Sequence, residues 1–167
     1  MILVLANIFR ILASIFDLMA ANTNNTKKIY LYNGIYNFLL GIQYYLLNAI
    51  AGAISSFAAI LRNIIFQKHK NSFYALIIYL VFTVIINIPA YDGIISILPI
   101  IMVFMYSIAI YKADLIKIKY TVIITCALEI IYDIYYNAYI GAILCVLNII
   151  VVIISLIRIK ISKAKNK

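Results

Sequence analysis

The stretch NAIAGAI at residues 48–54 recurs 89 positions later as NAYIGAI at residues 137–143, with five of the seven residues identical. Each copy interrupts a long apolar run and supplies the Asn and Gly that tight turns favour. As a single helix, residues 29–66 would be about 57 Å long, nearly twice the thickness of a hydrocarbon core. Each copy therefore predicts a hairpin between two helices, and the spacing predicts an internal repeat.

The composition is typical of a membrane protein. Of the 167 residues, 67% are apolar and 11% are charged, whereas a soluble domain is about half apolar and a quarter charged. A folded chain of this size still exposes much of its surface, so one soluble core would not hide this much hydrocarbon. The composition excludes a soluble enzyme, a disordered chain and a disulfide scaffold. It predicts an all-α membrane protein whose spans are helices.

Seven apolar runs are long enough to cross a bilayer as helices. They cover residues 2–21, 29–47, 49–66, 73–91, 94–111, 118–138 and 140–159. The recurring hairpin divides them into two three-helix repeats, at residues 1–72 and 92–159, joined by a linker helix at residues 73–91. A repeat of three helices begins and ends on opposite sides of the membrane. The linker helix returns the chain to the first side, so both repeats have the same orientation and are related by an axis along the membrane normal. Residues 160–167 are expected to form a basic cytoplasmic tail.

The basic residues indicate the orientation of the chain. With the N-terminus outside, the inner loops and inner span ends hold every Lys and Arg except Arg10, which lies within the first span. This positive-inside pattern predicts a multi-pass membrane protein, N-out and C-in. The expected partners are the lipid bilayer and anionic headgroups at the cytoplasmic face. The net charge of +9 is thereby explained without nucleic-acid binding.

Many tyrosines lie near the ends of the predicted spans and predict an aromatic belt at the membrane interfaces. They are Tyr30, Tyr32, Tyr44, Tyr45, Tyr91, Tyr111, Tyr120, Tyr135, Tyr136 and Tyr139. The two cysteines, Cys126 and Cys145, lie inside spans and have neither CxxC spacing nor a nearby His. We expect them to be small packing residues, and we expect no metal site, disulfide or cofactor.

Charged residues inside the spans mark the positions where a function is expected. A charge at the centre of a span costs about 2.5–3.5 kcal/mol, so it needs a partner or a water-filled cavity. Counting depth along the spans predicts that Arg10 pairs with Glu129 or Asp133 near mid-depth. The same count predicts a second, structural ion pair between Asp17 and Arg62 nearer the inner side.

Two interpretations of these charges remain open. In the structural one, the ion pairs serve helix packing only. In the functional one, they belong to a polar site between the repeats, where Glu129 or Asp133 takes up a proton or a cation, or accepts hydrogen bonds from a solute. The candidate substrate-binding residues are Asn37, Glu129, Asp133, Arg10 and Asn148. Asn37 ranks first because it lies at mid-depth in the span that corresponds to the sixth span in the other repeat.

Three stretches carry a resemblance to known families: residues 45–53, ILRNIIF at residues 60–66 before a basic loop, and residues 137–148. On these, the whole chain resembles the YgjV family of bacterial inner-membrane proteins. Its three-plus-one-plus-three pattern also resembles the SWEET and PQ-loop superfamily of small-solute carriers, and this resemblance implies transport. The chain departs from those carriers in having no Pro-Gln dipeptide and only Pro99 at a position matching their gating prolines.

We therefore expect a small-solute transporter or facilitator with a polar site near the bilayer midplane. The alternative is a non-transporting structural or interaction protein of the membrane. An enzyme is not expected, because the chain has no HExxH or GxSxG motif and no His within a span.

Overall fold

The chain is all-helical, in a computed structural model that describes residues 1–69, 72–112 and 114–165. The helices are α1 (Ile2–Asn22), α2 (Thr26–Leu46), α3 (Ile50–Lys68), α4 (Phe73–Asn87), α5 (Ile97–Tyr111), α6 (Leu115–Tyr135) and α7 (Tyr139–Lys165). Two short 3-10 helices, η1 (Ile88–Ala90) and η2 (Ile94–Ser96), connect α4 to α5. The expected all-α fold class is confirmed, and the seven helices follow the seven apolar runs.

Polar caps move two helix starts one turn upstream of the apolar runs. The side chain of Asn25 accepts the backbone N–H of Lys27 at 3.0 Å and begins α2. In the same way, Asp114 accepts the N–H of Ile116 at 3.0 Å and begins α6. A capping side chain satisfies an N–H that has no partner in the first turn, so the helix extends beyond its apolar part.

The last helix is longer than expected. α7 continues to Lys165, so the predicted tail at residues 160–167 is a helical extension as far as that residue. Residues 166–167, and the side chains of residues 162–165, lie outside the described part of the chain.

The two recurring stretches form two copies of one turn. Asn48 and Asn137 both adopt the left-handed conformation, with φ of 60° and 57°, which Asn tolerates better than most residues. In each copy the following Ala N–H bonds back to the carbonyl five residues earlier: Ala49 to Tyr44 at 2.9 Å and Ala138 to Asp133 at 2.7 Å. This is the Schellman pattern of helix termination. Tyr44 and Asp133 therefore occupy equivalent positions in the two hairpins.

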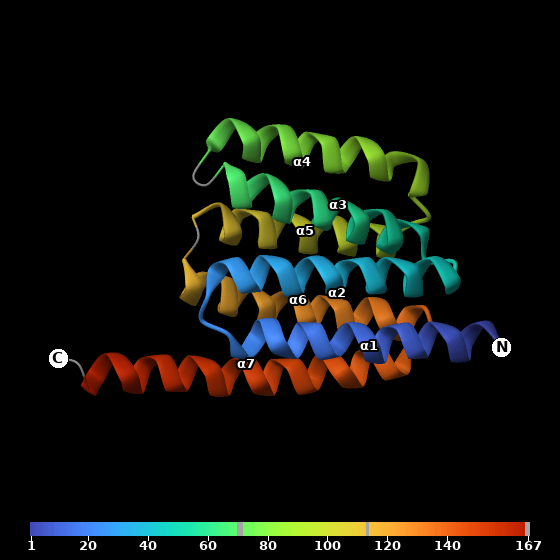
Figure 1. Ribbon diagram of the computed structural model, residues 1–167. Helices are drawn as coiled ribbons and strands as arrows, with labels where there is room; N and C mark the ends of the chain where they lie inside the picture. The colour runs from blue at the N-terminus through green and yellow to red at the C-terminus, as the bar shows by residue number, and fades with distance from the viewer. Residues whose placement is uncertain (70–71, 113, 166–167) are drawn as a thin grey trace.

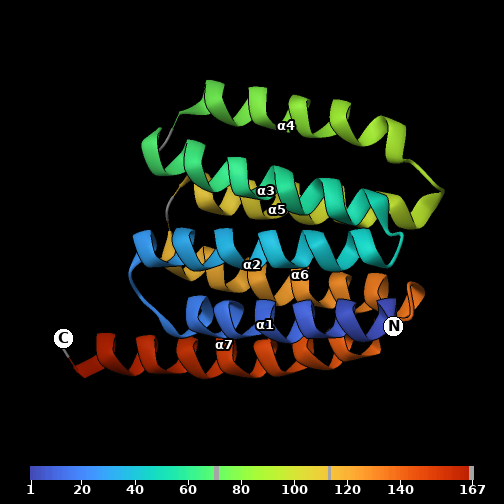
Figure 2. The same cartoon turned by 45° about the vertical axis from the view of Figure 1, so that its right-hand side comes forward.

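The helices form two rows that pack against each other (Figures 1 and 2). In one row α2 lies between α1 and α3, and in the other α6 lies between α5 and α7. The rows meet where α1 packs on α7 and where α3 packs on α5, and α4 covers the edge formed by α3 and α5. α1 and α5 run in the same direction (Figure 1). The contact of α3 with α5 and the contact of α7 with α1 therefore join the two rows at their two edges. The division of the chain into two parallel repeats stays a prediction.

The two ends of the bundle differ in chemistry. We call one the turn end: it holds the N-terminus, both Asn turns and the η1–η2 connection, on the right in Figure 1. The opposite basic end holds the loops that follow α1, α3 and α5 and the end of α7, with Lys27, Lys68, Lys112 and Lys160 among its residues. The orientation of the basic end toward the cytoplasm stays a prediction.

The surface of the bundle is suited to lipid. Five segments among the described residues are long and apolar enough to cross a membrane: α1, α3, α7 to Ile161, α4 with η1, and η2 with α5. Large apolar side chains such as Ile78 and Ile143 are exposed, whereas Arg10 and Asp133 are buried, at 2% and 0% exposure. This is the reverse of a soluble protein. α2 and α6 are as long as α1 but more polar.

Candidate functional site

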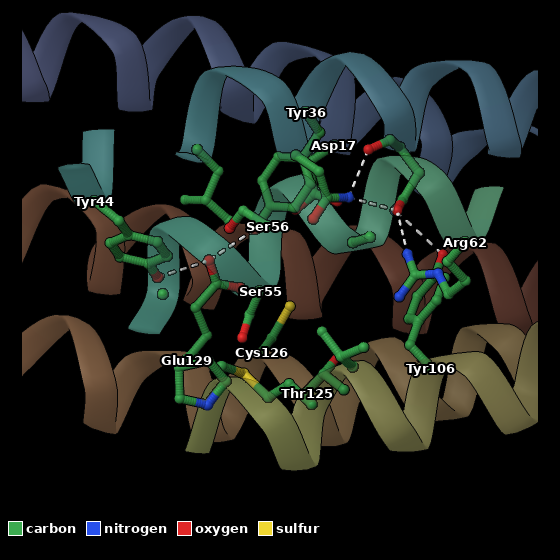
Figure 3. Close-up of a pocket in the computed structure, with 18 of the residues that line it drawn as sticks. Asp17, Tyr36, Tyr44, Ser55, Ser56, Arg62, Tyr106, Thr125, Cys126 and Glu129 are labelled. Carbon is green, nitrogen blue, oxygen red and sulfur yellow. Dashed lines mark hydrogen bonds between the residues drawn. The ribbon is translucent and has the colours of Figure 1, made fainter. Parts of the chain in front are cut away.

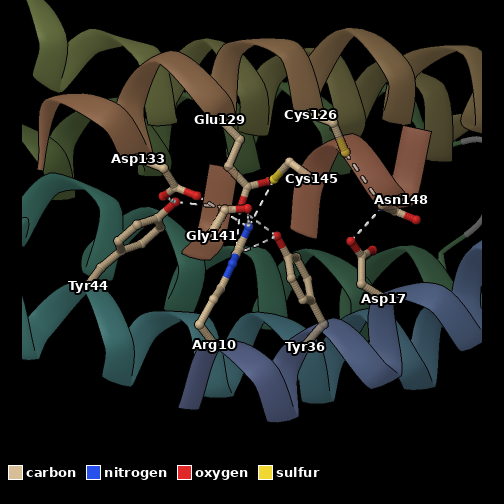
Figure 4. Close-up of polar contacts among 10 residues, drawn as sticks. All are labelled: Arg10, Asp17, Tyr36, Tyr44, Cys126, Glu129, Asp133, Gly141, Cys145 and Asn148. Atoms are coloured by element: carbon tan, nitrogen blue, oxygen red, sulfur yellow. Dashed lines mark hydrogen bonds and ion pairs between the residues drawn. The ribbon is translucent and has the colours of Figure 1, made fainter. Parts of the chain in front are cut away.

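Arg10 is the centre of a buried ion-pair network (Figure 4). Arg10 lies in the half of α1 nearer the turn end. Its Nη1 lies 2.8 Å from Glu129 Oε1, and its Nη2 lies 3.4 Å from Asp133 Oδ2. Nη2 also donates to the carbonyl of Gly141 at 3.3 Å and to Cys145 Sγ at 2.9 Å. One guanidinium from α1 thus joins α6 and α7, and the structure brings the predicted residues of the sixth span together with Arg10.

Two tyrosines of α2 complete this network. Tyr36 Oη donates to Glu129 Oε1 at 2.7 Å, and Tyr44 Oη donates to Asp133 Oδ1 at 2.9 Å. The prediction that Tyr44 belongs to the interface belt is therefore wrong, as it is for Tyr30: each is only 2% exposed. Tyr44 lies in the last turn of α2, but its side chain is directed toward α6 and away from lipid.

Arg62 is the centre of a second cluster, nearer the basic end. Its Nη2 donates to Asn33 Oδ1 at 3.1 Å and to Asn63 Oδ1 at 3.2 Å, and its Nε donates to Asn63 Oδ1 at 3.3 Å. The guanidinium carbon lies 4.4 Å from the centre of the Tyr106 ring. These partners are neutral, so this buried cation is held by amides and an aromatic face.

The predicted ion pair between Asp17 and Arg62 is not formed in the structure. Asp17 instead accepts a hydrogen bond from the side-chain amide of Asn148 on α7. The two charged residues lie at matching depths, but α2 separates α1 from α3. Equal depth in the membrane therefore does not predict an ion pair between these two residues, because α2 lies between their helices.

A cavity of about 80 Å³ lies between the two clusters. Its walls come from α1, α2, α3, α5 and α6, so both halves of the chain contribute. Tyr44 and Glu129 lie at one end and Arg62 and Tyr106 at the other (Figure 3). Such a volume holds several water molecules or one small solute.

The predicted site residues divide into cavity-lining and supporting residues. Asn37 and Glu129 line the cavity, whereas Arg10, Asp133 and Asn148 do not. The amide of Asn37 donates to the backbone carbonyl of Asn33 at 2.6 Å and to its Oδ1 at 2.8 Å.

The cysteines take part in the polar network. Cys126 Sγ, Cys145 Sγ and a Glu129 oxygen lie within 4.8 Å of one another, which is a possible metal-ligand set. However, Arg10 contacts both Glu129 and Cys145, and its positive charge disfavours a cation between them. We assign the three side chains to the ion-pair network. The expectation that the cysteines only pack is incomplete, because Cys145 accepts from Arg10 and Cys126 accepts from Asn148 at 3.5 Å.

Sequence reasoning missed Tyr36 and Tyr44 as site residues, although a pattern in the sequence would have found them. Asn33, Asn37 and Tyr44 recur on one face of α2 at helical spacing, with Tyr36 beside them. When polar residues share one face of a membrane helix and the other residues are apolar, the polar face is expected to be directed toward the other helices and away from lipid.

Comparison with known proteins supplies the family. No curated protein and no solved structure matches the chain. A family model described as "Bacterial inner membrane protein" and named Imp-YgjV matches residues 4–163, nearly the whole chain. The chain therefore belongs to the Imp-YgjV family of bacterial inner membrane proteins.

Proposed function

We propose that the protein is a transporter or facilitator of a small polar solute in the inner membrane, and that the cavity is its binding site. The observation that carries the proposal is the charged lining: Asp17 and Arg62 from the first half and Glu129 from the second. Charges at membrane depth mark solute and ion pathways. Transporters built from repeats place the solute near the midplane, between the repeats.

The pairing of the charges favours transport over a purely structural role. The Arg10 network pairs opposite charges and by itself is compatible with packing alone. Arg62 and Asp17, in contrast, contact neutral amides. A chain that needed only packing would be more stable with apolar residues at these two positions.

The route of the solute follows from the contacts at each end of the cavity. Toward the turn end, the cavity is closed by the Arg10 network with its two tyrosines. Toward the basic end, a smaller cavity of about 20 Å³ shares Asp17, Asn33 and Tyr106 with the main one and extends to Lys119. We propose that transport alternates between breaking the network at the turn end and widening this passage.

The motion we propose is a rigid-body movement of one row of helices against the other, as in the SWEET-like carriers that the repeat pattern resembles. Pro99, the residue that matches their gating prolines, lies in the first turn of α5. Proline in a first turn breaks no backbone hydrogen bond, so it does not kink the helix.

We also propose that the protein is not an enzyme. Ser55, a hydroxyl of the cavity wall, donates to the neutral amide oxygen of Asn87 at 3.0 Å. A hydrolase nucleophile needs a base at that position.

Cysteine labelling tests whether the cavity is wet. Ala58 and Ala59 are equally buried, at 2% exposure each, but only Ala59 lines the cavity. In a variant with Cys126 and Cys145 replaced by alanine, we expect Ala59→Cys to react with a membrane-impermeant thiol reagent applied from at least one side. Ala58→Cys should stay unlabelled because it packs between helices.

Equal protection of both cysteines, applied from either side of sealed vesicles, would contradict the proposal. The network and its cavity would then be a dry interface, and the structural alternative would take its place.

A further inference from the structure

We propose that the solute carries a single carboxylate and that Arg62 binds it. This rests on the proposed function, since it names the chemical class of the solute that the cavity accepts.

The first support is the unused hydrogen-bonding capacity of Arg62. The residue is 3% exposed and lines the cavity. Its Nε and Nη2 donate to Asn63 and Asn33, whereas Nη1 donates to no acceptor among the described residues. Nη1 therefore keeps both N–H groups for a ligand in the cavity (Figure 3). A guanidinium presents such donors in the geometry that a carboxylate accepts.

The second support is the missing counter-charge. Within residues 1–69, 72–112 and 114–165, Arg10 has two carboxylate partners and Arg62 has none. The Tyr106 face, 4.4 Å away, supplies a favourable but weaker interaction than an ion pair. A buried cation without a counter-ion is costly, and an anionic solute would remove that cost on binding.

The rest of the lining limits the solute to one negative charge. Asp17 and Glu129 also line the cavity, so a second anionic group would meet two carboxylates. A phosphate monoester carries a charge of about −1.5 to −2 at pH 7, whereas Arg62 is the one Arg or Lys among the described residues that line this cavity. The volume of about 80 Å³ admits only a small molecule. Short monocarboxylic acids, amino acids included, fit these limits.

The test supplies the missing counter-charge from within the protein. Ala59 lines the cavity on α3, three residues before Arg62, and side chains at this spacing are neighbours on a helix. Ala59→Asp therefore offers Arg62 an internal carboxylate. Ala59→Asn has the same shape without the charge and is the matched control.

The measurement is the unfolding temperature of the full chain in detergent with acetate, lactate, glycine or alanine, and with glucose as the neutral solute, at constant ionic strength. At ten times the Kd measured for each protein, a bound carboxylate should raise the unfolding temperature by about 3–6 °C in the parent protein and in Ala59→Asn. The Kd of Ala59→Asn should be higher, because the added amide occupies part of the cavity. In Ala59→Asp the rise should disappear, while the unfolding temperature without solute should exceed that of Ala59→Asn.

Three results would overturn the inference: a rise with glucose but none with any carboxylate, no rise with any solute, or an equal rise with carboxylates in Ala59→Asp. None of these outcomes alters the cysteine labelling at Ala59. Labelling at that position would preserve the proposed function with another solute class, whereas its absence would remove both.

Discussion

Replacing Arg10 with leucine is expected to lower the free energy of unfolding by about 3–5 kcal/mol, the cost typical of removing one partner from a buried ion pair. The substitution leaves Glu129 and Asp133 buried without a cation, and it removes the donor to Cys145 and to the Gly141 carbonyl. Tyr36 and Tyr44 keep their hydrogen bonds to the carboxylates, which limits the loss. Denaturant unfolding in detergent micelles measures it.

Arg158→Leu is the matched control for Arg10→Leu. Arg158 is exposed near the basic end, and its guanidinium makes one long contact, 3.5 Å, to Asn22 Oδ1. We expect a change below about 0.5 kcal/mol there, as for most surface substitutions. If Arg10→Leu changed the free energy of unfolding as little as Arg158→Leu, the network would not be a dry, closed layer. The proposed closure of the cavity toward the turn end would then be wrong.

Gly141→Ala is expected to destabilise the protein by about 2–3 kcal/mol, the upper range for added volume in a packed interior. A Cβ at this position would overlap the Asp133 carboxylate, with Asp133 Cγ at 2.9 Å and Arg10 Nε at 3.1 Å. Either the carboxylate or α7 must move, and both movements stretch the ion pair. Thermal unfolding of the purified variant measures the effect.

Gly34→Ala is the control, because the nearest atom to a Cβ there is Asn63 Nδ2 at 4.0 Å. Alanine is the better helix former, so this variant should be more stable by about 0.5–1 kcal/mol. If Gly141→Ala were as stable as Gly34→Ala, the close approach of α6 and α7 around Arg10 would be wrong.

The helices and turns could be predicted from the sequence because they depend on local chemistry. The turns at Asn48 and Asn137 could be predicted because Asn tolerates the left-handed conformation that each turn requires. Depth along a helix is also local, at about 1.5 Å per residue. It was enough to match Arg10 with Glu129, because both lie about equally far from their helix ends and the long Arg10 side chain reaches α6 beside the contact of α1 with α7.

The rest could not be predicted, because it depends on which helices become neighbours. Asp17 and Arg62 have the same depth, yet α2 lies between their helices. Tyr44 is close to a helix end, where an interface position is the usual outcome, but the turn that follows it directs it inward against Asp133. The free Nη1 of Arg62 is likewise invisible in the sequence, because it depends on Asp17 and Glu129 lining the same cavity without forming an ion pair with Arg62.

Uptake by proteoliposomes is the most direct test of the central claim, that a small solute crosses the membrane through this cavity. Vesicles containing the parent protein or Ala59→Asn are expected to accumulate radiolabelled alanine or lactate faster than protein-free vesicles. Vesicles containing Ala59→Asp should match the protein-free rate. Uptake by the parent protein equal to that of protein-free vesicles, across amino acids, short monocarboxylates, sugars and nucleosides, would contradict the account and leave the ion pairs with a structural role alone.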